Sequence, residues 1–201
     1  MPLFRTHRTL KENTADEDHA LVQRLRSGDD FALNEIMQRY KDRVCRLAWR
    51  YVGNEDTALD VTQETFTKLY FNIDKYDSAY KFSTWLFQIA VNLCRDHLRK
   101  NKNHARNISP DALNETGPGD WQRSDENIEA GFLARQQLTL LRREIDLLPD
   151  TLKEAFILFA VEEKSQAECA EILNVSAKTV ETRVYRARKT LSEKLQLSFE
   201  G

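Results

Sequence analysis

Residues 165–194 read SQAECAEILNVSAKTVETRVYRARKTLSEK, and this stretch decides the fold of the C-terminal part of the chain. Ser165 and Glu168 have the spacing of a capping box, in which each side chain binds the other residue's backbone amide at a helix start. Asn174 favours the left-handed backbone that closes a helix, and Ser176 favours the N-cap of a second helix. The stretch therefore predicts a short helix, a tight turn and a longer helix, which is a helix-turn-helix.

The second of these helices has one apolar face and several polar ones. Val180, Val184, Ala187 and Leu191 recur at helical spacing and predict a buried seam. Arginine can bind guanine, threonine can contact the thymine methyl, and cations neutralise phosphates. A charged surface helix is the alternative, but the two caps, the turn length and the seam favour DNA binding. The candidate DNA-binding residues are Lys178, Thr179, Glu181, Thr182, Arg183, Tyr185, Arg186 and Lys189.

The rest of the chain predicts an all-α fold in two small domains. The 201 residues include only 6 Gly and 4 Pro, and no segment alternates with period two. Apolar residues recur at helical spacing in the N-terminal half, with helices expected at about 16–26, 33–51, 54–73 and 81–102. Between the two halves, the segment 104–127 contains two prolines, two glycines and many polar residues, which predicts a flexible acidic linker. The expected boundaries are 14–103 for the first domain, 104–127 for the linker and 128–199 for the second domain.

Charge is distributed in blocks although the net charge is only −2. Residues 81–106 and 176–194 are basic, and residues 107–130 between them are acidic. No apolar run is long enough to span a bilayer and the N-terminus has no apolar signal core, so we expect a cytoplasmic protein without membrane insertion. The three cysteines lie far apart without metal-site spacing, which predicts reduced thiols, no metal and no cofactor.

Four segments together carry a family resemblance: GNEDTALDVTQETFTKLY at 53–70, YKFSTWLFQIAVNLCRDHLRK at 80–100, LPDTLKEAFIL at 148–158 and AEILNVSAKTVETRVYRARKTL at 170–191. In this order they resemble the extracytoplasmic-function (ECF, group 4) family of bacterial sigma factors, over about residues 16–197. The resemblance implies an RNA polymerase specificity subunit whose first domain reads and opens the −10 promoter element and whose second domain reads the −35 element. The partners it implies are promoter DNA, the β′ clamp helices and β flap of core polymerase, and an anti-sigma factor.

The resemblance also implies a polymerase-binding face on the helix at 54–73. The residues expected to dock on the clamp helices are Asp56, Asp60, Gln63, Glu64 and Thr67. An ordinary solvated face is the alternative that the residues alone would favour. The family usually has an acidic DAED stretch where this chain has TALD at 57–60. Phosphorylation of Thr57 or Thr62 is one hypothesis for restoring the missing charge.

The −10 element is expected to contact the loop before the third long helix and one face of that helix. The loop residues are Tyr76, Asp77, Ser78, Ala79, Tyr80 and Lys81. In the family this loop captures a base flipped out of the duplex. Flipping the base costs a few kcal/mol of stacking energy, and the contacts of the base with its binding pocket offset that cost. Tyr76 and Tyr80 are expected to stack, while Ser78 and Lys81 donate hydrogen bonds. On the helix, one face suited to a phosphate backbone carries Gln88, Val91, Asn92, Arg95, Arg99 and Lys102.

Two other classes of protein compete with a sigma factor. A helix-turn-helix regulator that binds duplex DNA by itself usually carries a receiver or ligand domain, and no βαβ alternation predicts one here. An enzyme is disfavoured because the four histidines are scattered and there is no nucleophile motif, glycine-rich phosphate loop or evident pair of carboxylates. We therefore expect no catalytic residues in this chain.

Overall fold

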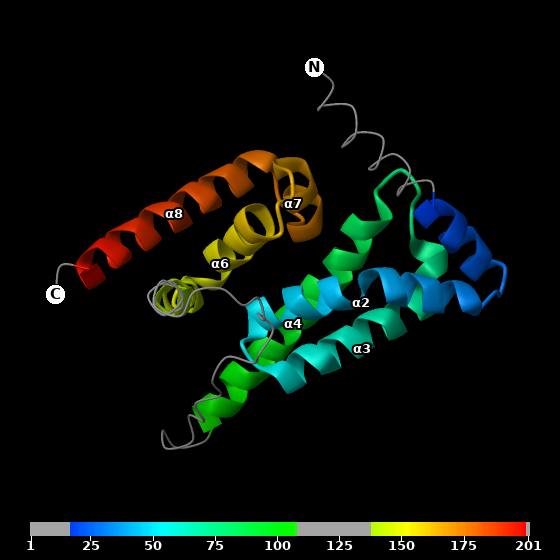
Figure 1. Cartoon of the computed structure of the whole chain (residues 1–201), viewed down its shortest axis with the longest axis horizontal. Helices are drawn as coiled ribbons and strands as arrows, with labels where there is room; N and C mark the ends of the chain where they lie inside the picture. Colours follow the sequence, from blue (N-terminus) through cyan, green and yellow to red (C-terminus); the bar gives the residue numbers. More distant parts are fainter. Residues whose placement is uncertain (1–16, 108–137, 200–201) are drawn as a thin grey trace, which may run out of the picture. The chain divides into compact units, whose positions relative to one another are not determined.

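The computed structural model describes residues 17–107 and 138–199, and every regular element in those ranges is a helix. The chain divides into two compact units, Met1–Ile108 and Ser109–Gly201 (Figure 1). The predicted all-α class in two helical domains is confirmed. The predicted linker lies outside the described residues from 108 onward. Residues 104–107, expected at its start, continue the last helix of the first unit instead.

Three long helices form the body of the first unit. A helix over 17–26 is followed by α2 (Phe31–Val52), α3 (Glu55–Asn72), the 3₁₀ turn η1 (Ile73–Lys75) and α4 (Phe82–Asn107). The helices α2, α3 and α4 pack against one another pairwise (Figure 1). Their fully buried side chains include Ile36, Leu47, Leu69 and Phe87. Each such burial contributes about 1.5–3 kcal/mol, so burial of the amphipathic stripes is the main favourable contribution to the packing of the three helices.

The turn between α2 and α3 is formed by two adjacent residues. Gly53 has a left-handed backbone (φ 73°), and its N–H donates to the carbonyl of Trp49 at 2.8 Å. Asn54 then caps α3, because its Oδ1 accepts from the N–H of Thr57 at 2.8 Å. The short GNED break at 53–56 thus reverses the chain and sets the start of α3.

The second unit is smaller and is arranged around one long helix. It consists of a helix over 138–146, α6 (Asp150–Phe156), the π turn η2 (Ile157–Val161), α7 (Gln166–Leu173) and α8 (Ala177–Phe199). Both α6 and α7 pack on α8. The helix that begins at Asp150 changes character at Ile157, where the wider π turn begins. Leu148, Ala187 and Leu191 form a buried cluster against which Ile145, Leu152 and Phe156 pack.

The connection between η2 and α7 contains a strained residue. Glu163 has φ 51°, a conformation that costs a residue with a Cβ atom about 1–2 kcal/mol. Lys164, which follows, is only 8% exposed, and its N–H donates to the carbonyl of Leu158 at 3.0 Å. The chain thus makes this turn with Glu163 and Lys164, without a glycine.

We expect Glu163→Gly to raise the free energy of unfolding of the second unit by about 0.5–1 kcal/mol, because glycine adopts positive φ without strain. Asn174→Gly is the matched control: Asn174 has nearly the same backbone (φ 54°), but asparagine tolerates it, so its gain is smaller. Urea unfolding monitored by circular dichroism measures both. Equal or opposite shifts for the two variants would contradict the strain at Glu163.

Candidate nucleic-acid interface

The helix-turn-helix predicted at 165–194 is present with its caps. The N–H of Glu168 donates to Ser165 Oγ at 3.2 Å, and the N–H of Ser165 donates to Glu168 Oε2 at 2.9 Å. Asn174 closes α7 in the left-handed conformation, and the N–H of Thr179 donates to Ser176 Oγ at 3.1 Å at the start of α8. Local hydrogen bonds therefore set the length of the turn and the direction in which α8 leaves it.

The faces of α8 divide as the sequence predicts. Val180, Val184, Ala187 and Leu191 are buried. Among the predicted DNA-contacting residues, Thr179 and Arg183 are half-buried at the flanks, and the others, Lys178, Glu181, Thr182, Tyr185, Arg186 and Lys189, are exposed. The apolar seam thus fixes α8 on its unit and leaves a continuous polar surface for a ligand.

Side-chain contacts indicate which groups on this surface are available. Tyr185 is 67% exposed, and no described residue forms an ion pair or hydrogen bond with Arg186. The Thr182 hydroxyl donates to the carbonyl of Lys178 at 2.9 Å, which leaves its methyl group for an apolar contact. The ion pair between Lys178 and Glu181, at 3.0 Å, is exposed and contributes little stability. Arg186 and Tyr185 are therefore free to engage a base or phosphate.

Arg188 has a structural contact that the helical pattern did not reveal. Its guanidinium carbon lies 5.6 Å from the ring centroid of Phe159 in the π turn. A cation over an aromatic face contributes about 0.5–1 kcal/mol at an exposed site. Arg188 therefore connects α8 to η2.

The predicted polymerase-binding residues lie together on one face of α3. Asp56, Asp60, Gln63 and Thr67 are exposed, opposite a buried stripe made by Ala58, Val61, Thr65, Phe66 and Leu69. Glu64 is half-exposed beside them, within 3.3 Å of Lys68 and 3.7 Å of His97 Nε2. The face is acidic and rich in hydrogen-bonding groups, which suits a basic partner.

The same face contains apolar residues that the sequence analysis missed. Phe71 is 77% exposed and Tyr70 is partly exposed, and their ring centroids are 5.4 Å apart. They lie three and four residues after Thr67, so they extend the acidic face by one turn. Leu59 is also exposed on this side of α3. The signal in the sequence was a pair of aromatic residues placed on the polar face of the helix. Exposed aromatic side chains mark binding surfaces, so such a pair indicates one.

The two candidate phosphorylation sites differ in exposure. Thr62 is 3% exposed, and its hydroxyl donates to the carbonyl of Ala58 at 2.7 Å. A phosphate has no room in this core, so the hypothesis is wrong for Thr62. Thr57 is half-exposed in the first turn of α3 and remains a candidate.

The loop at 76–81 is ordered by its own hydrogen bonds, and one predicted role in it is wrong. Tyr76 is 6% exposed, its ring packs on Phe82 and Trp85, and its hydroxyl donates to the carbonyl of Tyr80 at 2.6 Å. Burial raises the pKa of the Tyr76 hydroxyl. Tyr76 is therefore a packing residue and does not present its ring for stacking on a base, whereas Tyr80 is 53% exposed.

The tip of the loop is a compact turn. Asp77 Oδ1 accepts from the N–H of Ala79 at 2.9 Å, and the Asp77 carbonyl accepts from the N–H of Tyr80 at 3.1 Å. Ser78 and Lys81 are exposed on either side. The predicted hydrogen-bonding groups and Tyr80 thus project from a preformed turn.

The predicted DNA-facing side of α4 is only partly exposed. Asn92 and Arg99 are exposed, and Gln88 and Arg95 are half-buried. Val91, also expected on this face, is fully buried. Arg95 Nη1 donates to Asn92 Oδ1 at 3.2 Å, which aligns the two groups along the helix.

Within 17–107 and 138–199, no three histidine, cysteine or acidic side chains gather as a metal site would require. Burial raises the pKa of the Cys169 thiol to about 12, which makes this thiol a poor nucleophile at neutral pH. Among the described helices, none combines the length and the apolar character needed to cross a membrane.

Two family models of the sigma-70 type match the two helical units in order. The family model for Sigma-70 region 2 matches residues 36–104, and the model for Sigma-70, region 4 matches residues 138–191. The chain is 33% identical over 184 residues to the ECF RNA polymerase sigma factor SigW of Bacillus subtilis, covering 87% of this chain and 95% of the relative. The chain belongs to the family of ECF RNA polymerase sigma factors. It is an alternative sigma factor for promoter recognition and transcription initiation.

Two solved structures share the fold. CnrH in complex with the cytosolic domain of CnrY matches with a TM-score of 0.66 and 27% identity, over 90% of this chain and 97% of that one. The sigma factor RpoE from Bartonella quintana, solved with the anti-sigma factor NepR, matches with a TM-score of 0.63 and 22% identity, over 81% and 96% of the two chains. The second likeness is evidence for the fold alone.

Proposed function

We propose that the two units divide promoter recognition between them. The polar face of α8 reads the −35 element in the major groove. The loop 76–81, with Tyr80 at its exposed tip, and the basic face of α4 hold the opened −10 element. The observation that carries this proposal is the capped helix-turn-helix whose α8 buries one seam and leaves Arg186 and Tyr185 available.

The acidic face of α3 is proposed to bind the β′ clamp helices of core polymerase, with the second unit bound at the β flap. Complementary charge favours fast association and fixes the register of two surfaces. An anti-sigma factor is the proposed inhibitor, since RpoE of Bartonella quintana was solved with one. The chain itself carries out no catalysis in this scheme, and it acts in the cytoplasm, where core polymerase is found.

Reconstitution with core polymerase tests this function against that of a stand-alone regulator. We expect the purified chain to bind promoter DNA weakly alone and strongly with core enzyme, and to direct initiation from a subset of genomic promoters. Transcript start-site sequencing with and without the chain identifies those promoters. Tight, sequence-specific binding by the chain alone, without any effect on initiation, would instead establish a regulator.

Phosphorylation at Thr57 is proposed as a control of polymerase binding. Thr57 follows Glu55 and Asp56 at the N-terminus of α3, where added negative charge is favoured by the helix dipole. We expect Thr57→Asp to bind core polymerase about threefold more tightly than Thr57→Ala, since one added ion pair with a basic partner at an exposed surface contributes about 0.2–1 kcal/mol. Fluorescence anisotropy of the labelled chain measures both affinities. Equal affinities would remove the hypothesis.

A further inference from the structure

Arg26 connects the first described helix to the segment between α3 and α4. Its Nε and Nη2 donate to the carbonyl oxygen of Ile73 at 3.2 and 3.1 Å, and Nη2 lies 3.4 Å from the carbonyl oxygen of Asp74. The same Nη2 donates to the carbonyl oxygen of Tyr76, and the guanidinium carbon lies 5.9 Å from the centroid of the Tyr76 ring. The half-buried side chain of Arg26 therefore binds three carbonyl groups that are close to one another but far from Arg26 in the sequence.

These contacts join carbonyls of η1 and of the loop that follows it, and one of them, that of Ile73, also accepts from the N–H of Tyr76 at 3.2 Å. Carbonyls just beyond the C-terminus of a helix lie near the negative end of its dipole, so a guanidinium is a favourable partner there. Charge-assisted hydrogen bonds of this kind are stronger than neutral ones. Arg26 thus fixes the backbone at Tyr76, where the loop 76–81 begins.

Tyr76 transmits this position to the tip of the loop. Its hydroxyl donates to the carbonyl of Tyr80 at 2.6 Å, and its ring packs on Phe82 and Trp85 at the start of α4. A contiguous series of contacts runs from Arg26 through Tyr76 to the backbone of the exposed Tyr80. The buried Tyr76 therefore fixes the backbone of the loop, while the side chain of Tyr80 stays exposed.

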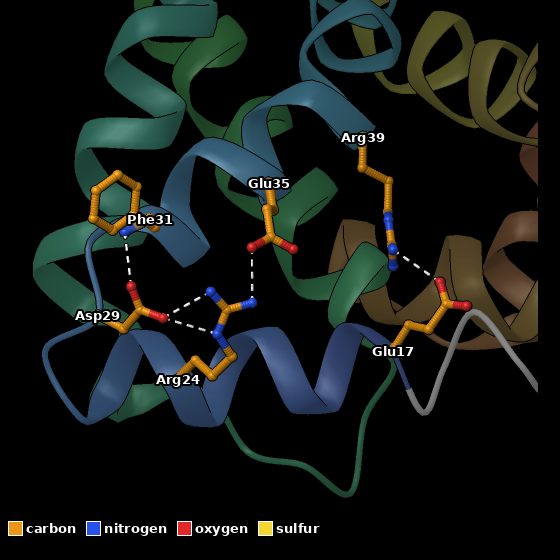
Figure 2. Close-up of polar contacts among 6 residues, drawn as sticks. All are labelled: Glu17, Arg24, Asp29, Phe31, Glu35 and Arg39. Carbon is orange, nitrogen blue, oxygen red and sulfur yellow. Dashed lines mark hydrogen bonds and ion pairs between the residues drawn. The ribbon is translucent and has the colours of Figure 1, made fainter.

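Ion pairs fasten the helix that carries Arg26 to α2, as Figure 2 shows. Near the C-terminal end of that helix, Arg24 lies 2.7 Å from both Asp29 and Glu35. Near the N-terminal end, Arg39 of α2 lies 2.8 Å from Glu17. These exposed pairs fix the register of the helix on α2, and each contributes little stability by itself.

A buried contact completes the attachment. Asp18 is almost fully buried, accepts from the Tyr40 hydroxyl, and lies 2.7 Å from an Arg39 nitrogen. The Tyr40 ring packs edge-on against Phe82, with the centroids 5.6 Å apart. The helix over 17–26 is therefore coupled to both sides of the loop: through Arg26 to Tyr76, and through Tyr40 to the first residue of α4.

We propose that Arg26 is a positioning residue for strand opening: it holds the loop 76–81 in the shape that receives a base extruded from the −10 element. The inference rests on the proposed function of that loop. A preformed receiving site avoids the cost of ordering the loop when the duplex opens, so opening is more favourable. Arg26 itself does not touch DNA in this scheme.

The test uses holoenzyme reconstituted from core polymerase and the full chain. Permanganate reactivity of −10 thymines measures opening on a duplex promoter, and the yield of short transcripts measures initiation on the same promoter premelted by mismatches. We expect Arg26→Gln to lower opening of the duplex about tenfold, as loss of charge-assisted hydrogen bonds predicts. On the premelted promoter, initiation by this variant returns to the wild-type level, because no base has to be extruded.

Two further variants separate positioning from stability. Arg24→Gln is the matched control: it removes a guanidinium from the same helix, but its contacts are with Asp29 and Glu35, and we expect normal opening. Tyr76→Phe keeps the ring and removes only the hydroxyl bound to Tyr80, and we expect a smaller loss of opening, about threefold. Core affinity and thermal unfolding of each variant are measured alongside.

Several outcomes would overturn the inference. The inference fails if Arg26→Gln or Tyr76→Phe opens the duplex as well as the wild type does. It also fails if the defect of Arg26→Gln persists on the premelted promoter. Tyr80→Ala separates the proposed role of the loop from the proposed role of Arg26. If Tyr80→Ala opens the duplex normally, the proposed function of the loop fails. If Tyr80→Ala is defective and Arg26→Gln is normal, only the role of Arg26 fails.

Discussion

Replacing Arg186 with alanine is expected to lower initiation from promoters with a −35 element about ten- to a hundredfold, because one arginine contact to a base edge contributes about 1–3 kcal/mol. Arg186 is exposed on α8 and no described residue pairs with it, so its loss leaves no buried partner unsatisfied. The free energy of unfolding of the second unit is expected to stay within about 0.5 kcal/mol of the wild type, as for other surface substitutions.

The measurement is single-round transcription by holoenzyme on two templates, one with the native −35 sequence and one with that sequence scrambled. Wild type discriminates between the templates, and Arg186→Ala discriminates less. Core affinity, measured in parallel, stays unchanged because the proposed clamp-binding face lies on α3. Loss of core binding in this variant would argue against the assignment of −35 reading to α8.

Replacing Phe71 with alanine is expected to weaken binding to core polymerase about tenfold or more, as truncation of a buried aromatic anchor at an interface does. Phe71 extends the acidic face of α3 and is the most exposed large apolar side chain among the described residues. Its ring also packs on Tyr70, so it presents a rigid apolar surface at low entropic cost.

Phe71→Leu is the matched control, since leucine keeps most of the apolar area at the same position. We expect Phe71→Leu to bind core polymerase within about threefold of wild type, because it loses only part of that area. Titration of labelled core enzyme at two salt concentrations separates this apolar contribution from that of the acidic residues. If Phe71→Ala and wild type bind equally, the polymerase contact ends before the last turn of α3.

The exposed aromatic residues also show why the sequence alone did not define the full α3 face. The prediction selected acidic and amide side chains because they are polar at that register. Phe71 and Tyr70 lie on the same face of α3, but an aromatic residue in a sequence is more often buried than exposed. Only the packing of α3 against α2 and α4 reveals that the Phe71 ring lies outside the core and that Tyr70 is partly covered, with its hydroxyl donating to Asp30 Oδ1 at 3.0 Å.

The caps, the seam of α8 and the break at 53–56 were readable from the sequence, because each depends on residues within one or two turns of one another. Thr62 and Tyr76 were misjudged because burial depends on which neighbouring helix covers a side chain, and that neighbour is distant in the chain. Arg26 shows the same limit most clearly. Its partners are backbone carbonyls, which have no residue identity, so no sequence pattern signals them. The local hydrogen-bonding preferences of the chain determined its helices and their ends, and only the tertiary packing decided which side chains hold the loop 76–81 and which remain available to a partner.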